Sequence, residues 1–168
     1  ELIGGEYKVV RDELYFVPST NKRLRLTMDE SSSAVRSLLD IGFYLRHVAH
    51  PNDLLMVDEP ELNLHPENQR KIARLFARLV NVGIKVFITT HSDYIIKELN
   101  TLIMLNQKSA LIDRIREKEK YLREELIKPD QLRVYMSRKD KVLFEGNTKR
   151  VSALTLVRAD IDPQLGIE

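Results

Sequence analysis

Two continuous apolar runs stand out in the pattern of hydrophobic and polar residues. Residues 53–58 end at the acidic pair Asp58 and Glu59, and residues 84–90 end directly before His91. Apolar runs of this length, bounded by polar residues and Pro, predict strands that are buried on both faces of a parallel sheet. The carboxyl ends of such strands are where open α/β sheets bind ligands.

The segment between the two runs, residues 66–82, predicts a helix that begins at Pro66 and stops at Gly83, because Pro suits the first helical turn and Gly suits a helix end. Four apolar residues at helical spacing form its expected inward face: Ile72, Leu75, Phe76 and Leu79. Strand, helix and strand in this order predict a right-handed βαβ unit with parallel strands. The acidic pair and His91 should therefore meet at one edge of the sheet.

The residues before this unit show two other patterns. Residues 6–17 and 22–28 alternate apolar and polar positions around the turn-forming residues 18–21, which predicts an antiparallel hairpin with one wet face. Next come three serines, residues 31–33, which are natural helix N-caps. The apolar residues after them have the spacing of one helix face: Val35, Leu38, Leu39, Phe43 and Val48.

The residues after the unit predict a short helix, capped by Ser92 or Asp93 and extending through Leu99. Residues 108–128 are highly charged and predict a solvated helix that stops at Pro129; a partner-binding arm is the alternative interpretation. Three short closing strands are expected after it, over residues 131–137, 141–145 and 151–157, with a turn at Gly146-Asn147.

Composition bounds the class of protein. At 168 residues and 43% hydrophobic content, the chain fits a single α/β domain over residues 1–168 with a real core. Its 27 basic and 25 acidic residues leave a net charge of +2, which by itself gives no reason to expect strong binding to nucleic acid or to a membrane surface. With no cysteine, no signal peptide and no membrane span in the sequence, we expect a cytoplasmic protein without membrane partners.

The acidic pair has a clear chemical use when a magnesium-bound triphosphate lies beyond the strand. One carboxylate can hold the hydrated metal while the other orients the attacking water. An acidic loop that only solvates a strand end is the alternative. Two further features favour the chemical interpretation: His91 offers an imidazole donor at the same edge, and the serine-rich helix start offers hydroxyl and N–H groups to an anion.

The sequence LLMVDEP, followed by ELNLHP and later by THS, resembles the second half of an ABC-type ATPase head. It is most similar to bacterial AAA-family ATP-binding proteins grouped with the overcoming-lysogenization-defect ATPases, and more distantly to recombination and chromosome-maintenance heads. The resemblance covers residues 29–106, with the hairpin of residues 1–28 before it and a helix and closing strands over residues 107–168. It implies a P-loop NTPase-like parallel sheet flanked by helices, and ATP with Mg²⁺ as substrate and cofactor.

The resemblance also implies roles for the residues at the strand ends. Asp58 matches the magnesium-site carboxylate of the Walker B motif, and Glu59 matches the general base. His91 matches the switch histidine that contacts the γ-phosphate. Residues 61–65 match the D-loop, which couples two sites across a dimer; its interface candidates are Glu61, Asn63 and His65.

Two departures from the family pattern qualify this resemblance. Residues 31–35 lie where an L-S-G-G-Q-like signature belongs, but Ser33 and Ala34 replace small glycines, so Ser32 and then Ser33 are the expected contacts to a partner subunit's nucleotide. The sequence also has no G-x-x-x-x-G-K-S/T loop to cradle phosphates. We therefore expect a partial head, the C-terminal lobe, without an initiator Met and inactive by itself.

The function expected for the complete protein is ATP binding and hydrolysis by two heads that form a homodimer around ATP. In such proteins hydrolysis opens the dimer and drives an attached module, here a DNA-repair or phage-defence type of machine with DNA as a further partner. A catalytically inactive dimerisation or binding module that keeps the ATPase shape is the alternative, motivated by the missing phosphate loop and the altered signature.

Overall fold

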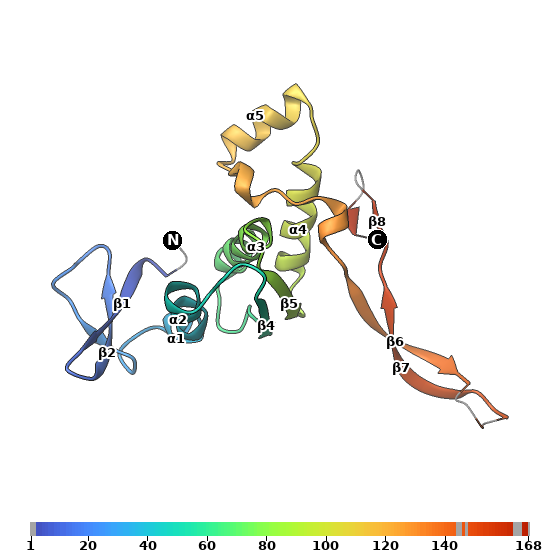
Figure 1. The fold of residues 1–168 in the computed structure, drawn as a ribbon, viewed down its shortest axis with the longest axis horizontal. Helices are drawn as coiled ribbons and strands as arrows, with labels where there is room; N and C mark the ends of the chain where they lie inside the picture. Colours follow the sequence, from blue (N-terminus) through green and yellow to red (C-terminus); the bar gives the residue numbers. More distant parts are fainter. Residues whose placement is uncertain (1–2, 144–145, 147, 163–165, 168) are drawn as a thin grey trace. The chain divides into compact units, whose positions relative to one another are not determined.

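The computed structural model describes residues 3–143, 146, 148–162 and 166–167 (Figure 1). The chain divides into two units, each with its own internal contacts. Unit 1 consists of Glu1–Leu99 and Leu122–Glu125, and unit 2 consists of Asn100–Tyr121 and Leu126–Glu168. None of the helices in the described residues is both long enough and apolar enough to span a membrane.

Unit 1 begins with an antiparallel sheet in the order β1-β2-β3. Strands β1 (Gly5–Val10) and β2 (Glu13–Pro18) form a hairpin, and β3 (Leu26–Thr27) pairs with the other edge of β2. The predicted antiparallel pairing is confirmed, but the prediction of one strand over residues 6–17 is wrong. The chain reverses at Arg11 and Asp12, whose φ values of 51° and 66° suit a two-residue hairpin turn with both central residues left-handed.

The serine-rich segment begins a helix, as predicted. Ser32 is the N-cap of α1 (Ser33–Ser37), and its Oγ accepts a hydrogen bond from the Val35 N–H at 3.3 Å. The helix is interrupted at Leu38, where φ is −95° and ψ is 3°, and a second helix, α2 (Leu39–His47), follows. Of the predicted apolar face, Val35 and Leu38 are buried, Leu39 and Phe43 are half-buried, and Val48 is 56% exposed because it follows the end of α2. Ile41, which was not predicted, is buried beside them.

The predicted βαβ unit forms around a parallel strand pair. Strand β4 (Leu54–Asp58) leads through a loop to α3 (Pro66–Asn81), and β5 (Lys85–Thr89) then pairs with β4 in register from Leu54↔Lys85 to Asp58↔Thr89. Ile72, Phe76 and Leu79 of α3 are buried as predicted, and Leu75 is half-buried. Gly83, with φ 91°, follows the end of α3. Figure 1 shows α3 beside β5.

Only one face of the β4–β5 pair is covered. Leu54, Met56 and Phe87 project from the other face and are 59%, 64% and 53% exposed. The prediction that both faces are buried is therefore wrong for this chain. The physical reason is that the parallel sheet of the described residues has two strands, so the second face lacks the neighbouring elements that a wider doubly covered sheet provides.

Helix α4 (Asp93–Met104) follows β5 after three residues. Of the two candidate caps, Ser92 fills the position, because its Oγ accepts hydrogen bonds from Tyr94 N–H at 3.1 Å and Ile95 N–H at 3.3 Å. The helix was predicted to end at Leu99, but it continues to Met104. Buried Ile95 and Leu99 stabilise its first half within unit 1.

The remaining elements correct the expectations for the C-terminal third. Helix α5 (Ala110–Lys118) ends well short of residue 128, because the chain turns at Lys120 with φ 57°. Two short 3-10 helices follow, η1 (Arg123–Glu125) and η2 (Pro129–Gln131).

Unit 2 contains a long antiparallel ribbon, formed by β6 (Tyr135–Val142) and β7 (Val151–Arg158). Strand β6 replaces two predicted strands, while β7 agrees with the third within one residue. Residues 144–145 of the predicted strand 141–145, and Asn147 of the predicted turn, lie outside the described residues. A short pair, β8 (Ile161–Asp162) and β9 (Gly166–Ile167), follows the ribbon.

Candidate functional site

The carboxyl ends of β4 and β5 form the candidate site. Asp58 and Thr89 are the last pair of the parallel ladder, and the Thr89 hydroxyl donates a hydrogen bond to Asp58 Oδ1. One residue further, the Glu59 N–H donates to the Thr89 carbonyl at 3.1 Å. Since Asp58 continues the exposed face of β4, its carboxylate lies in solvent at the sheet edge.

Glu59 and His91 meet just beyond the strands, as the sequence predicts for the two strand ends. His91 Nε2 lies 3.5 Å from Glu59 Oε1. The His91 side chain is 90% exposed, and that of Glu59 is 36% exposed. Glu59 has φ 44°, a left-handed conformation that is uncommon outside Gly, Asn and Asp. The two side chains are therefore accessible to a ligand and adjacent to each other.

The loop after β4 and the loop after β5 are joined by side chains. Glu61 Oε1 accepts two hydrogen bonds of 2.7 Å, from the Thr90 hydroxyl and from the His91 N–H. Gln69 Oε1 accepts a bond of 2.5 Å from the Ser92 hydroxyl. Sequence reasoning assigned Glu61 to a dimer interface and missed Gln69, Thr90 and Ser92 as partners, because nothing in their spacing reveals contacts across 23 to 30 residues.

A hollow of about 400 Å³ lies over these loops. Residues from both loops and from the starts of α3 and α4 line it: Glu59, Glu61, Leu62, Gln69, His91, Ser92, Asp93 and Tyr94. Its carboxylates and imidazole can exchange protons with a bound molecule, while Leu62 and Tyr94 provide apolar surface. The hollow thus combines the candidate base and the candidate imidazole in one accessible space.

Asn63 and His65, the other candidates in the loop, have local partners. Asn63 has φ 60°, and its Nδ2 donates to Ser37 Oγ at 3.3 Å. His65 is the N-cap of α3, where its Nδ1 accepts a hydrogen bond from the Glu67 N–H at 3.3 Å. Both residues thereby support the conformation of the loop between β4 and α3.

Ser32 and Ser33 lie apart from the residues that line the hollow. The Ser32 hydroxyl is engaged as the cap of α1, and Ser33 is exposed in its first turn. Neighbouring Ser31 is buried and donates from Oγ to the Thr27 carbonyl at 2.8 Å. The structure therefore brings together Asp58, Glu59, Glu61 and His91, but not the two signature serines.

A magnesium ion suits the donors at the edge of the sheet. Asp58 and Glu59 supply the hard carboxylate oxygens that Mg²⁺ prefers, and Mg²⁺ usually takes only one or two carboxylates beside substrate phosphates and water. The residues that the structure describes contain no group of three or more His, Asp or Glu side chains placed to hold a metal ion. The donors fit an ion that arrives with a phosphate ligand better than one held by protein alone.

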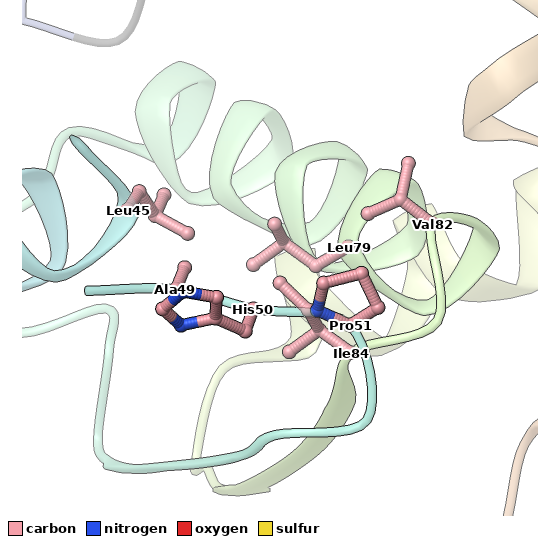
Figure 2. A pocket seen from close by; sticks show the side chains of 7 residues that line it. All are labelled: Leu45, Ala49, His50, Pro51, Leu79, Val82 and Ile84. Carbon is pink, nitrogen blue, oxygen red and sulfur yellow. The ribbon is translucent and has the colours of Figure 1, made fainter. Parts of the chain in front are cut away.

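A second hollow, of about 320 Å³, has a different character (Figure 2). Its lining is apolar apart from the His50 ring: Leu45, Ala49, His50, Pro51, Leu79, Val82 and Ile84. Beside it, a hydrogen bond from the His50 backbone N–H, followed by one from the Tyr44 hydroxyl, holds the pKa of Asp53 below its ordinary value. With this lining, the hollow lacks the polar groups that phosphate chemistry requires.

A family model described as AAA ATPase domain matches residues 4–96, which is more than half of the chain and includes Asp58, Glu59 and His91. The chain belongs to this family of ATPase domains. ATP binding and hydrolysis are accordingly its family chemistry, and the site at the ends of β4 and β5 lies within the matched region.

No curated protein matches the chain significantly. One similar solved structure is described as "Structural biochemistry of ATP-driven dimerization and DNA stimulated activation of SMC ATPases"; the match covers 89% of this chain and 74% of that chain, with 13% identity and a TM-score of 0.46. At this identity and TM-score, the likeness supports no statement about the function of this chain.

Proposed function

We propose that the site at the ends of β4 and β5 hydrolyses ATP, with Glu59 as the general base. The observation that carries this proposal is the 3.5 Å approach of Glu59 Oε1 and His91 Nε2 at the strand ends, inside the region matched by the ATPase family. In this arrangement Glu59 orients the attacking water and accepts its proton. His91 donates a hydrogen bond that stabilises charge on the transferred phosphoryl group.

Asp58 has a separate role in this proposal. Its carboxylate would hold the hydrated Mg²⁺, and the Thr89 hydroxyl, bonded to Asp58 Oδ1, orients that carboxylate. When bound, the metal neutralises charge on the phosphate oxygens. Protein groups outside these 168 residues are needed to cradle the phosphates, since the sequence has no glycine-rich loop ending in Lys and Ser or Thr.

The proposed assembly is a homodimer of complete heads around ATP, in the cytoplasm. Ser32 and Ser33 then contact the nucleotide of the partner subunit, and the loop with Glu61, Asn63 and His65 lies near the interface. The accessible side of the Glu59–His91 pair supports this assembly, because a second subunit can approach it and exclude water from the reacting phosphate.

Replacing Glu59 with Gln in the complete protein tests the proposal. We expect steady-state hydrolysis to fall at least about 100-fold, the usual contribution of a general base, while ATP binding is retained and ATP-bound dimers accumulate. The matched control is Glu67→Gln, which removes an exposed carboxylate paired with Lys71 on α3. Hydrolysis at the wild-type rate in Glu59→Gln would refute the assignment.

The alternative proposal is an inactive dimerisation module with the ATPase shape. It is favoured by the altered signature and by the use of the Ser32 hydroxyl as a helix cap. The two proposals differ in one measurement on the complete protein: an inactive module binds Mg-ATP and dimerises but releases no phosphate. For this chain by itself, we expect calorimetry to detect weak or no Mg-ATP binding; micromolar affinity would contradict a partial site.

We also propose that the complete protein works on DNA, supported by the ribbon β6–β7. Cross-strand partners place eight residues on one face, none of them acidic: Tyr135, Ser137, Lys139, Lys141, Ser152, Leu154, Leu156 and Arg158. Lys139 and Lys141 are about 6.7 Å apart along the strand, twice the axial phosphate rise of one DNA strand. A two-stranded ribbon also fits the major groove. The near-neutral net charge of the chain does not reveal that Lys139, Lys141 and Arg158 share this face.

DNA binding measured against salt concentration tests the ribbon. In the complete protein, the double variant Lys139→Glu and Lys141→Glu should weaken binding and reduce the slope of log K against log[salt] by about 2. The control pair is Lys118→Glu and Lys120→Glu, exposed residues outside the ribbon. Equal losses in the two pairs, or DNA affinity unchanged in the ribbon variant, would contradict this proposal.

A further inference from the structure

Side chains take over from backbone pairing at the point where β4 and β5 end. In the part of the chain that the structure describes, backbone pairing between the two segments ends with the hydrogen bond from the Glu59 N–H to the Thr89 carbonyl. Beyond it, the Glu61 carboxylate reaches across to the Thr90 hydroxyl and the His91 N–H, at 2.7 Å each. An ionised acceptor makes these bonds stronger than neutral ones. The Glu61 carboxylate therefore links the two loops beyond the strand ends.

The link is supported from α3 and α4. The Ser92 hydroxyl, which caps α4, donates to Gln69 Oε1 at 2.5 Å, and Gln69 Nε2 donates to the Leu64 carbonyl at 2.9 Å. Glu61 Oε2 is shielded from solvent and has no hydrogen-bond partner among the described residues. Burying a carboxylate oxygen without a hydrogen bond costs free energy. The orientation of the Glu61 side chain is therefore held by the neighbours that donate to Oε1 and not by solvent.

His91 depends on this link for its position. Its imidazole is 90% exposed, so packing against other side chains cannot fix it. The position of the ring therefore depends on the His91 backbone, whose N–H donates a hydrogen bond to Glu61. The same carboxylate follows Glu59 by two residues in the preceding loop, so beyond the end of the strand ladder it ties the backbone of the candidate imidazole to the loop of the candidate base.

We infer that Glu61 is a positioning residue, which holds the His91 loop against the loop of Glu59 and so maintains the distance between the two reacting side chains. This inference rests on the proposed ATPase function for its consequence, but its structural content is independent of it. It assigns Glu61 a role within one chain, in addition to any place at a dimer interface.

Amide hydrogen exchange of His91, followed by NMR, tests the structural content. Glu61→Ala removes the acceptor, and the His91 amide should exchange about tenfold faster, which corresponds to about 1.4 kcal/mol. Glu61→Gln keeps an oxygen that can accept both bonds and should exchange less than about threefold faster. Asp93→Asn is the control, because Asp93 lines the same hollow and pairs with Lys97 on its own helix. Equal exchange rates in Glu61→Ala and the wild type would overturn the inference.

Kinetics of the complete protein test the consequence. In Glu61→Ala we expect kcat for ATP hydrolysis to fall about tenfold while KM for ATP changes less than about twofold, because the chemical step and not nucleotide binding depends on the His91 position. Glu61→Gln should recover most of the rate. A rise in KM with unchanged kcat would contradict the positioning role. If the wild-type protein releases no phosphate, the proposed function fails, whereas the exchange result on His91 still decides the role of Glu61.

Discussion

At the scale of single residues, several residues with side chains have left-handed backbone conformations at sharp turns of the chain. Glu59 and Asn63 bracket the loop after β4 with φ values of 44° and 60°, and Arg11 and Asp12 close the first hairpin. A left-handed conformation costs a residue with a side chain about 1–2 kcal/mol. Glu59, the candidate base, is one of these residues, which is consistent with the tendency of strained residues to cluster at functional sites.

Tyr7 joins the antiparallel sheet to the helices of unit 1. Its hydroxyl donates to the Val35 carbonyl at 2.5 Å, and its ring centroid lies 5.9 Å from that of Phe43. Gly42 leaves room for the ring, since a Cβ there would lie 3.0 Å from Tyr7 Cε2. Burial, with a smaller contribution from Asp40, raises the pKa of Tyr7 to about 12.

This raised pKa predicts a specific alkaline weakening of the fold. Between about pH 10 and pH 12 an unfolded chain loses the Tyr7 proton while the folded protein keeps it, so unfolding becomes more favourable as pH rises, and the full contribution is present only below about pH 10. In Tyr7→Phe the free energy of unfolding should fall by about 0.5–1.5 kcal/mol at pH 7, through the lost hydrogen bond, and then decline less steeply above pH 10. Urea unfolding at pH 7, 10 and 11 measures both effects. Parallel pH profiles for variant and wild type would show that Tyr7 is not responsible.

At the scale of elements, α3 and α4 are joined by a buried charge. The Glu98 side chain is 0% exposed, with Oε1 at 2.6 Å from Arg74 Nε. Its Oε2 lies 3.2 Å from Arg70 Nε, close enough for an ion pair but without hydrogen-bond geometry. Because Arg74 is mostly covered and Arg70 is half exposed, the Glu98–Arg74 contact carries most of the electrostatic stabilisation.

Removing one partner of this pair should be strongly destabilising. For Arg74→Ala we expect a loss of about 3–5 kcal/mol in the free energy of unfolding, since the buried Glu98 carboxylate is left without its hydrogen-bonded cation. For Arg70→Ala the expected loss is at most about 1 kcal/mol, because solvent screens that contact. Chemical denaturation of the two variants checks the difference. Losses of similar size would mean that the two arginines share the carboxylate equally.

At the scale of the whole molecule, the candidate site is assembled from two adjacent strand ends that are about thirty residues apart in sequence. The motif order and the apolar runs were sufficient to predict the parallel pairing and the meeting of Glu59 with His91. They were not sufficient to predict the exposed face of Leu54, Met56 and Phe87, because burial depends on how many elements pack on a sheet and not on the strand's own residues.

The division between sequence and tertiary structure follows the range of the interactions. Local chemistry in the sequence determined a serine cap within residues 31–33, the helix beginning at Pro66, and the placement of Asp58, Glu59 and His91 at strand ends. Tertiary structure decided the link from Glu61 to Thr90 and His91, the buried Glu98–Arg74 pair and the basic face of the ribbon. Each of these depends on side chains brought together by packing or by strand register, which hydrophobic periodicity and residue spacing do not encode.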